Sequence, residues 1–322
     1  MLRYLFLATA LATPVRADVA DVVTTHILPG YAAFTDATAA LSVASQGSCD
    51  AAALRPAYDA AFDAWLGVSH LRLGPVEDDG RMLAIAFWPD PKGLGKKALA
   101  TLIAAKDPLV SDPEAFAKVS IAARGLFAME RLLYGDATGD HACAVTRAVA
   151  ADLARTATET EAGWTDGFAE ALTMAGTEGN MQFLSPLEAR QAMFTQLIAG
   201  LEFNADQRLG RPLGTFDKPR PERAEARASA RSLQNLRLSL IALRGLAVAL
   251  VAESPQVQAA FDRAIGLAGK LDDPIFAGVA DPQGWLKVQI VQQAVFATRD
   301  AVLAEIGPAL GVGIGFNAGD GD

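Results

Sequence analysis

The chain has 322 residues, of which 51% are hydrophobic and 20% charged, and its formal net charge is −9. An acidic protein of this kind is not expected to bind nucleic acid or anionic lipid, and it favours cations or basic ligands. Its length is enough for two domains of ordinary size.

The N-terminus has the pattern of an export signal. Arg3 precedes an apolar run from Tyr4 to Ala12, and the Val15–Ala17 segment has the small-x-Ala pattern that signal peptidase cuts. We therefore expect a signal peptide over residues 1–17, cleavage after Ala17 and a periplasmic mature protein. No membrane span is expected, because the best later apolar stretch, 238–252, is interrupted by Arg244.

Helical periodicity dominates the rest of the chain. Apolar residues from Leu233 to Leu250 recur at spacings of three and four, which predicts one buried stripe on a long helix. Similar patterns predict helices over residues 51–71, 112–134, 143–174, 187–209 and 288–306. The fold class is therefore predicted to be all-α.

Two helical-bundle domains are expected, over residues 18–178 and 179–322, with an ancient duplication as their origin. The boundary is placed in the irregular stretch 176–186, which separates the predicted helices into two similar sets. A second irregular stretch, 74–95, is rich in Gly, Pro and Asp, and a third covers residues 210–221.

The chain has two cysteines, Cys49 and Cys143. An exported protein matures where disulfides form, so we expect these two residues to be bonded to each other.

The loop 74–95 collects polar groups beside an aromatic side chain, a composition typical of a ligand pocket. A satisfied junction between loop and bundle would have the same composition, so the residues alone favour neither interpretation. With the end of the preceding helix, the candidates are His70, Glu77, Arg81, Trp88 and Asp90. The other histidines, His26 and His141, have no acid at ligand spacing.

Glu130 is a single acid on an apolar helix face. The residues three and four positions away are Leu126, Phe127, Leu133 and Tyr134. A carboxylate in such surroundings finds a partner, keeps its proton, or belongs to a working site.

Three blocks of sequence, in this order, resemble the imelysin family. They are AWLGVSHLRLGPVEDDGRMLAIAFWPDPKG at 64–93, ARGLFAMERLLYG at 123–135 and GVGIGFNAGDGD at 311–322. The resemblance implies an exported protein of two helical domains, with a site near their interface and an association with iron or other metal acquisition. The family also carries a peptidase label, but no HExxH motif or other standard protease constellation is present.

The family signature Gly-x-His-x-x-Glu is matched here by Gly125 and Glu130, whereas Phe127 stands at the histidine position. Phenylalanine cannot bind a metal, so His70 becomes the candidate replacement partner. We predict that the loop residues converge near Glu130. Glu130 itself is predicted to be a buried structural anchor paired with Arg124, Arg231 or His70, in preference to a metal ligand.

These observations favour a non-catalytic protein that binds a metal, such as iron or another divalent ion, or a small ligand at the domain interface. A metal-assisted peptidase is the first alternative. A scaffold that binds another envelope protein is the second.

Overall fold

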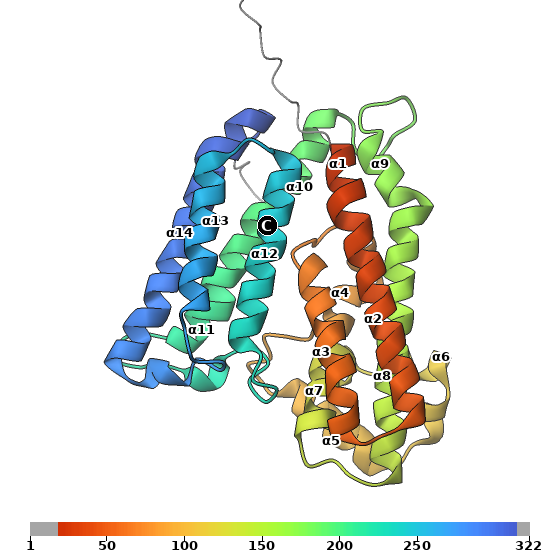
Figure 1. Ribbon diagram of the computed structural model, residues 1–322. Coiled ribbons are helices and arrows are strands. Elements are labelled where there is room, and N and C mark those ends of the chain that lie inside the picture. The colour runs from red at the N-terminus through yellow and green to blue at the C-terminus, as the bar shows by residue number, and fades with distance from the viewer. Residues whose placement is uncertain (1–18, 314–322) are drawn as a thin grey trace, which may run out of the picture.

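The computed structural model describes residues 19–313 and consists of helices joined by loops (Figure 1). Within these residues, β-type pairing is limited to one isolated bridge between Thr215 and Lys218. The predicted all-α fold class is confirmed. The expected signal peptide, residues 1–17, and residues 314–322 of the third sequence block lie outside the described residues.

The first group of helices forms the right-hand bundle in Figure 1. Its long members are α2 (Leu28–Gly47), α3 (Ala51–Val68) and α8 (Asp140–Gly163), and α2 packs against both of the others. The shorter members are α1 (Val19–Val22), α4 (Arg81–Ile85), α5 (Leu94–Ala105), α6 (Pro113–Phe116), α7 (Gly125–Tyr134) and α9 (Ala169–Thr173). Four 3-10 turns connect them: η2 (Gly74–Val76), η3 (Asp78–Gly80), η4 (Pro108–Ser111) and η5 (Ile121–Ala123).

The second group forms the left-hand bundle in Figure 1. It comprises α10 (Pro186–Glu202), α11 (Gly210–Leu213), α12 (Ser232–Leu250), α13 (Pro255–Gly269) and α14 (Pro282–Leu310), with 3-10 turns η8 (Pro221–Arg223) and η9 (Ala277–Ala280). Helix α14 packs against α10 and α13, and α12 packs against α3 of the first bundle. The stripe predicted from Leu233 to Leu250 is buried along α12, as the periodicity indicates.

The loop between the two groups, residues 174–185, contains the expected domain boundary at 178/179. The boundary and the ancient duplication stay predictions. The contact between α12 and α3 joins the bundles directly, so the interface between them is part of the folded core.

Three of the long helices contain a π-helical segment, which the apolar periodicity did not predict. These segments are η1 (Val23–Ile27), η6 (Trp164–Phe168) and η7 (Phe203–Leu209). An extra residue in a helical turn rotates the side chains that follow it, and such turns are frequent at functional sites. The three segments supply His26, Phe168 and Arg208 to the surroundings of the bundle interface described below.

The expected disulfide between Cys49 and Cys143 is confirmed. Its Cα atoms are 5.4 Å apart, and it closes a sequence separation of 94 residues. The bond joins the turn between α2 and α3 to the first residues of α8, so it links the three long helices of the first bundle at one end.

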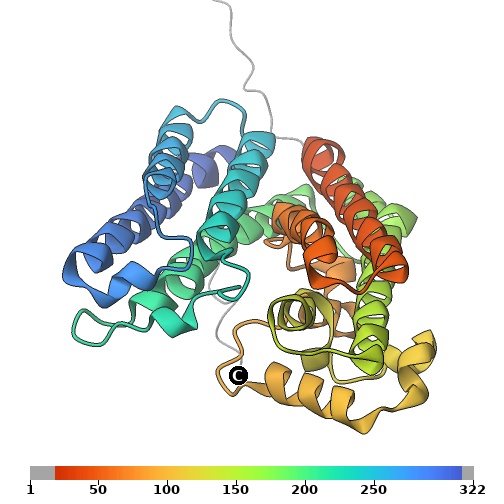
Figure 2. The same cartoon turned by 60° about the horizontal axis from the view of Figure 1, so that its bottom comes forward.

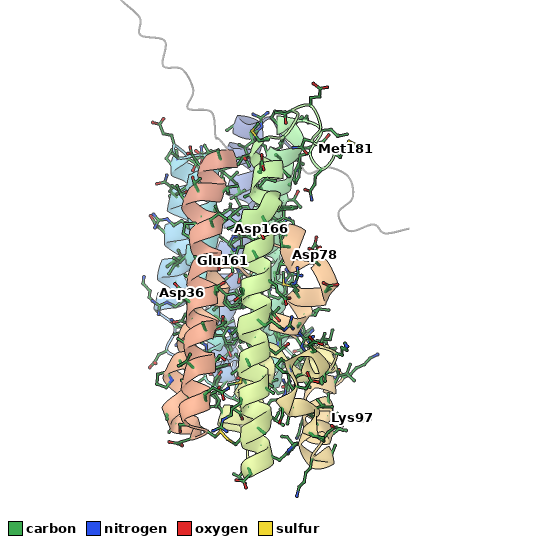
Figure 3. All side chains as sticks on the ribbon, turned by 90° about the vertical axis from the view of Figure 1, so that its right-hand side faces the viewer. Asp36, Asp78, Lys97, Glu161, Asp166 and Met181 are labelled. Atoms are coloured by element: carbon green, nitrogen blue, oxygen red, sulfur yellow. A yellow bond between two sulfur atoms is a disulfide. The ribbon has the colours of Figure 1, made fainter. Side chains whose placement is uncertain are left out.

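One helix among the described residues, α12, has the length and apolar composition to cross a membrane. Its apolar stripe is buried against α3, α10 and α13, which is the environment of a core helix. On the outer face of the first bundle, Asp36, Glu161 and Asp166 lie along α2, α8 and η6, and Asp78 lies at its edge (Figure 3).

Candidate functional site

Gly125 is the glycine of the signature and the first residue of α7. Its φ is +69°, and a Cβ at this position would lie 2.1 Å from the carbonyl oxygen of Ala84 and 2.3 Å from that of Ile85. Only glycine accommodates both the left-handed backbone and this close approach. The left-handed backbone at Gly125 also explains why the predicted helix 112–134 is interrupted before α7, whereas the break between α6 and η5 falls earlier, at residues 117–120.

Glu130 points from α7 toward the segment that precedes α12 and is only 6% exposed. Its Oε1 atom accepts two hydrogen bonds from Ser229, one from the backbone N–H at 2.9 Å and one from the hydroxyl at 2.7 Å. Glu130 therefore fastens the first bundle to the segment that leads into α12 of the second.

The cation pairs predicted for Glu130 are wrong for both arginines. Arg124 donates to Asp152 from Nε at 2.7 Å and from Nη2 at 3.1 Å. Arg231 is bound to Asp63, with a second acid of α3 beside it. Each arginine lies close to a carboxylate on a long helix instead. Glu130 is held by the two neutral donors of Ser229.

The third predicted partner, His70, is paired with another histidine. It is 3% exposed, and its Nε2 lies 3.0 Å from Nε2 of His26. Burial lowers the pKa of His26 to about 4, and burial with the nearby charge of Arg208 lowers the pKa of His70 well below its usual range. Both rings are therefore neutral at pH 7, with one donating to the other.

Phe127 fills the position of the signature histidine with aromatic packing. Its ring centroid lies 5.6 Å from that of Phe62 and 6.4 Å from that of Trp88. Trp88 also contacts Phe203 of η7, with centroids 5.9 Å apart. This face of α7 therefore presents an aromatic cluster, and Glu130 has no ligand beside it at position 127.

Asp90 is a structural residue at the start of α5. Its two carboxylate oxygens accept the backbone N–H groups of Leu94 and Gly95, both at 2.8 Å. Arg131 of α7 lies 3.6 Å from the same carboxylate. Trp88 and Asp90 thus both reach α7, the helix of Glu130.

Arg81 and Glu77 have different surroundings from Trp88 and Asp90. Arg81 donates to the carbonyl of Pro75 at 2.8 Å and lies 3.6 Å from Glu159 of α8. Its remaining contacts are with Asp78 and Asp79. Of the loop residues predicted to converge near Glu130, two reach α7, while Arg81, Glu77 and His70 are bound or placed elsewhere.

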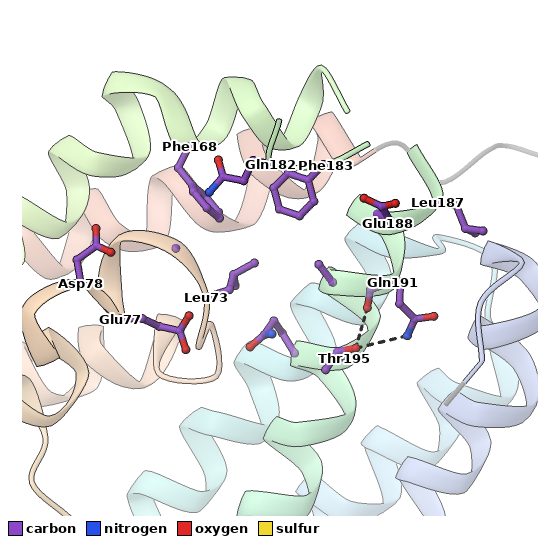
Figure 4. A pocket seen from close by; sticks show the side chains of 13 residues that line it. Leu73, Glu77, Asp78, Phe168, Gln182, Phe183, Leu187, Glu188, Gln191 and Thr195 are labelled. Carbon is purple, nitrogen blue, oxygen red and sulfur yellow. Dashed lines mark hydrogen bonds between the residues drawn. The ribbon is translucent and has the colours of Figure 1, made fainter. Parts of the chain in front are cut away.

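Glu77 lines a cavity of about 720 Å³ between the two bundles. One side is formed by the loop after α3 and by η6, and the other side by α10 (Figure 4). The lining residues are Leu73, Gly74, Glu77, Asp78, Phe168, Gln182, Phe183, Leu187, Glu188, Gln191, Ala192, Thr195 and Gln196. They include three carboxylates, three amides and two aromatic rings, and no cationic side chain.

Two features hold the rings of this cavity in place. Phe168 covers Gly74, where a Cβ would lie 2.6 Å from the ring, and its centroid is 5.9 Å from that of Phe183. Asn180 fixes the loop of Phe183 by accepting its N–H at 3.0 Å and donating to the carbonyl of Ala171 at 2.7 Å. The cavity is therefore formed before any ligand enters, which lowers the entropic cost of binding.

The residues of α10 that line the cavity were not predicted from the sequence. Its polar residues have structural partners: Glu188 accepts the N–H of Leu184 at 2.7 Å, and Gln196 accepts the N–H of Arg72 at 2.8 Å. The Ser185-x-x-Glu188 capping box was a readable signal for the start of α10, with Ser185 Oγ accepting the N–H of Glu188 at 3.2 Å.

A buried ion pair in the second bundle was also missed. Arg208 Nε donates to Glu225 at 2.8 Å, and each side chain is 5% exposed. Arg208 also donates to Asn204 at 2.9 Å and to Ser239 at 3.0 Å, and Asn235 donates to Glu225 at 3.1 Å. Glu225 of this network lies four residues before Ser229, the partner of Glu130.

A direct test of the Glu130 environment is Glu130→Gln. Burial is the largest influence on the pKa of Glu130 and raises it, while Ser229 and Arg131 lower it and Glu225 raises it further. Both hydrogen bonds from Ser229 go to one oxygen, which glutamine retains. We expect a loss of stability no larger than about 0.5 kcal/mol, instead of the ~3 kcal/mol of a broken buried ion pair.

The stability difference between wild type and Glu130→Gln should depend on pH, with a sign that follows from the raised pKa of Glu130. Below the pKa of an unfolded glutamate, about 4.3, the carboxyl is protonated in both states. As pH rises through the raised pKa of Glu130, the ionised and buried form costs free energy, so wild type should lose stability relative to Glu130→Gln. Urea unfolding at several pH values measures this difference. A wild type that gains on the variant as pH rises would contradict the assignment, and Ser229→Ala, which removes one donor, is the control.

The helices thus define a class of protein with two helical bundles, a glutamate anchor between them and a preformed cavity at their junction. The chain belongs to the imelysin family, whose family model, described as Imelysin, matches residues 27–302. A comparison with curated proteins found no match.

Two solved structures share the fold. An imelysin-like protein from Psychrobacter arcticum has a TM-score of 0.77 at 18% identity, covering 95% of this chain and 100% of that one. A candidate iron-regulated protein A precursor from Parabacteroides distasonis has a TM-score of 0.71 at 15% identity, covering 92% of this chain and 97% of that one. At these identities the likeness concerns the fold.

Proposed function

We propose that this protein is a non-catalytic binding protein of the cell envelope that holds a cationic small ligand or a metal ion between its two bundles, as part of iron acquisition. The observation that carries the proposal is the cavity of about 720 Å³, which is lined from both bundles and contains Glu77, Asp78 and Glu188 without a cationic side chain. Ligand pockets of about 300–1,000 Å³ are typical of small-molecule sites.

The chemistry of the lining supports a ligand with a positive charge and an apolar part. Glu77 extends toward the open space, and the rings of Phe168 and Phe183 line the same space (Figure 4). Carboxylates attract a cation or supply oxygen ligands to a hard metal ion, and aromatic faces attract cations and apolar groups. The formal net charge of −9 favours the same class of ligand.

The iron association draws on the family and on the name of the Parabacteroides distasonis protein. The periplasmic location draws on the export pattern at 1–17. The metal-assisted peptidase is the alternative function. The described residues contain no group of three or more His, Cys, Asp or Glu side chains placed to hold one ion, and this applies to a metal ion in the cavity as well as to the peptidase.

The proposal predicts saturable binding of a cationic probe that depends on Glu77. Isothermal titration calorimetry would use ferrous sulfate under anaerobic conditions and, separately, spermidine. We expect at least one probe to bind, and Glu77→Gln to weaken its binding about fivefold, the range of a partly exposed charge interaction. The matched control is Asp79→Asn, a nearby carboxylate outside the cavity lining.

Three outcomes would overturn the proposal. The first is equal binding by Glu77→Gln and Asp79→Asn, and the second is no binding of either probe. The third is hydrolysis of casein that stops when a chelator is added, which would establish the peptidase alternative.

A further inference from the structure

A second cavity, here called the α5 groove, lies on the first bundle beside α5 and has a volume of about 740 Å³. Figure 2 shows α5 in gold at the outer edge of that bundle. The groove is lined by Phe87, Leu94, Lys97, Ala98, Thr101, Leu102, Ala105, Asp107, Leu109 and residues 119–123. None of these residues lines the cavity between the bundles.

The wall of the α5 groove is apolar. Leu94, Ala98 and Leu102 follow one another at intervals of four residues and so lie on one face of α5, opposite Val119 and Ile121. Leu94 is 46% exposed, although it is a large apolar side chain. A ligand that covers this wall gains about 25 cal/mol for each Å² of apolar surface it removes from water.

One cation lies beside the wall, between Leu94 and Ala98 in sequence. Lys97 lines the groove, and among the described residues no ion pair or hydrogen bond of its ammonium group is found. The acid in the lining, Asp107, accepts the N–H of Leu109 at 2.9 Å beyond the other end of α5. Eight residue steps separate Lys97 from Ala105, which corresponds to about 12 Å along α5, and Asp107 lies beyond the end of that helix.

The segment around Lys97 has a small excess of positive charge. Five of the eight lysines of the chain and three acids, Asp107, Asp112 and Glu114, fall between residues 92 and 118, which gives this segment a formal net charge of +2, although the whole chain has a net charge of −9. The lysines are Lys92, Lys96, Lys97, Lys106 and Lys118. A local positive field of this kind raises the local concentration of anions.

We propose that the α5 groove binds an amphipathic organic anion, with its apolar body along Leu94, Ala98 and Leu102 and its anionic group at Lys97. The hydroxyl groups of Thr101 and Ser120 also line the groove, where they are additional polar contacts for the head group. Charge complementarity and a partly exposed apolar wall carry this assignment, which is independent of the function proposed for the cavity between the bundles.

The test compares three ligands that share one alkyl chain: dodecanoate, dodecanol and dodecyltrimethylammonium, titrated by calorimetry below their aggregation concentrations. We expect dodecanoate to bind most tightly. Lys97→Gln should raise its Kd about fivefold and Lys97→Glu should raise it further. Lys96→Gln, on the same helix but outside the lining, is the matched control. Ala98→Trp should fill the groove and raise the Kd of dodecanoate more than tenfold.

Several results would overturn the assignment. These are equal binding of the cationic analogue, equal effects of Lys97→Gln and Lys96→Gln, or binding to phosphatidylglycerol vesicles without binding of free dodecanoate. A dimer in sedimentation velocity that Ala98→Trp abolishes would make the groove an interface between two copies. Glu77→Gln should leave dodecanoate binding unchanged, which separates this test from that of the inter-bundle cavity.

Discussion

Removal of the Cys49–Cys143 disulfide should lower the free energy of unfolding by about 4 to 5 kcal/mol. The bond closes a separation of 94 residues, and constraint of the unfolded chain grows with the length of the closed loop. Urea unfolding of the Cys49→Ala/Cys143→Ala variant, compared with the oxidised wild type, measures the effect. Reductant should destabilise the wild type by a similar amount and leave the double variant unchanged.

The same variant should still bind ligand in the cavity between the bundles at temperatures well below its unfolding transition. Cys143 is near the start of α8 and Phe168 lies 25 residues later, just after the kink at Gly167, which places them roughly 37 Å apart along α8 and η6. Loss of the disulfide is therefore expected to lower the stability of the protein without changing ligand binding in the cavity between the bundles. Two reactive thiols in denatured, unreduced wild type, or a loss below ~1 kcal/mol, would contradict the prediction.

The helical fold could be predicted because each long helix has to bury a stripe against its neighbours. The stripe from Leu233 to Leu250 and the caps before 113 and 186 are local signals that do not depend on the partner helix. The π-helical segments could not be predicted, since an added residue in a turn leaves the residue types apolar while it changes the direction in which they point.

The candidate site was predicted only in part because its contacts are distant in sequence. Burial of Glu130 follows from its apolar neighbours on α7, but its partner Ser229 is 99 residues away in a segment without periodicity. Glu77 stands opposite α10 only after two bundles have packed together. The sequence suggested Arg124 or Arg231 as the partner of Glu130. In the fold Arg124 pairs with Asp152 and Arg231 pairs with Asp63.

Loss of one partner of the Arg208–Glu225 pair should destabilise the protein by about 3 to 5 kcal/mol, because a charge is then left buried without its counter-ion. Both side chains are 5% exposed and 2.8 Å apart. Arg208→Met leaves Glu225 with one remaining side-chain donor, Asn235, at 3.1 Å. Arg208→Met/Glu225→Leu removes both charges and should recover a large part of the loss.

The pair of Arg299 and Asp300, also 2.8 Å apart but with side chains 29% and 63% exposed, is the matched control, and Arg299→Met should cost less than about 1 kcal/mol. The buried pair has a second consequence, since Glu225 lies four residues before Ser229, the partner of Glu130. If Arg208 holds this segment in place, Arg208→Met should already weaken the bonds from Ser229 to Glu130. Ser229→Ala should then cost less in the Arg208→Met background than in wild type, by at least ~0.5 kcal/mol in a double-mutant cycle. Additive losses would mean that the ion pair stabilises the second bundle alone and that the anchor at Glu130 is set independently by α7.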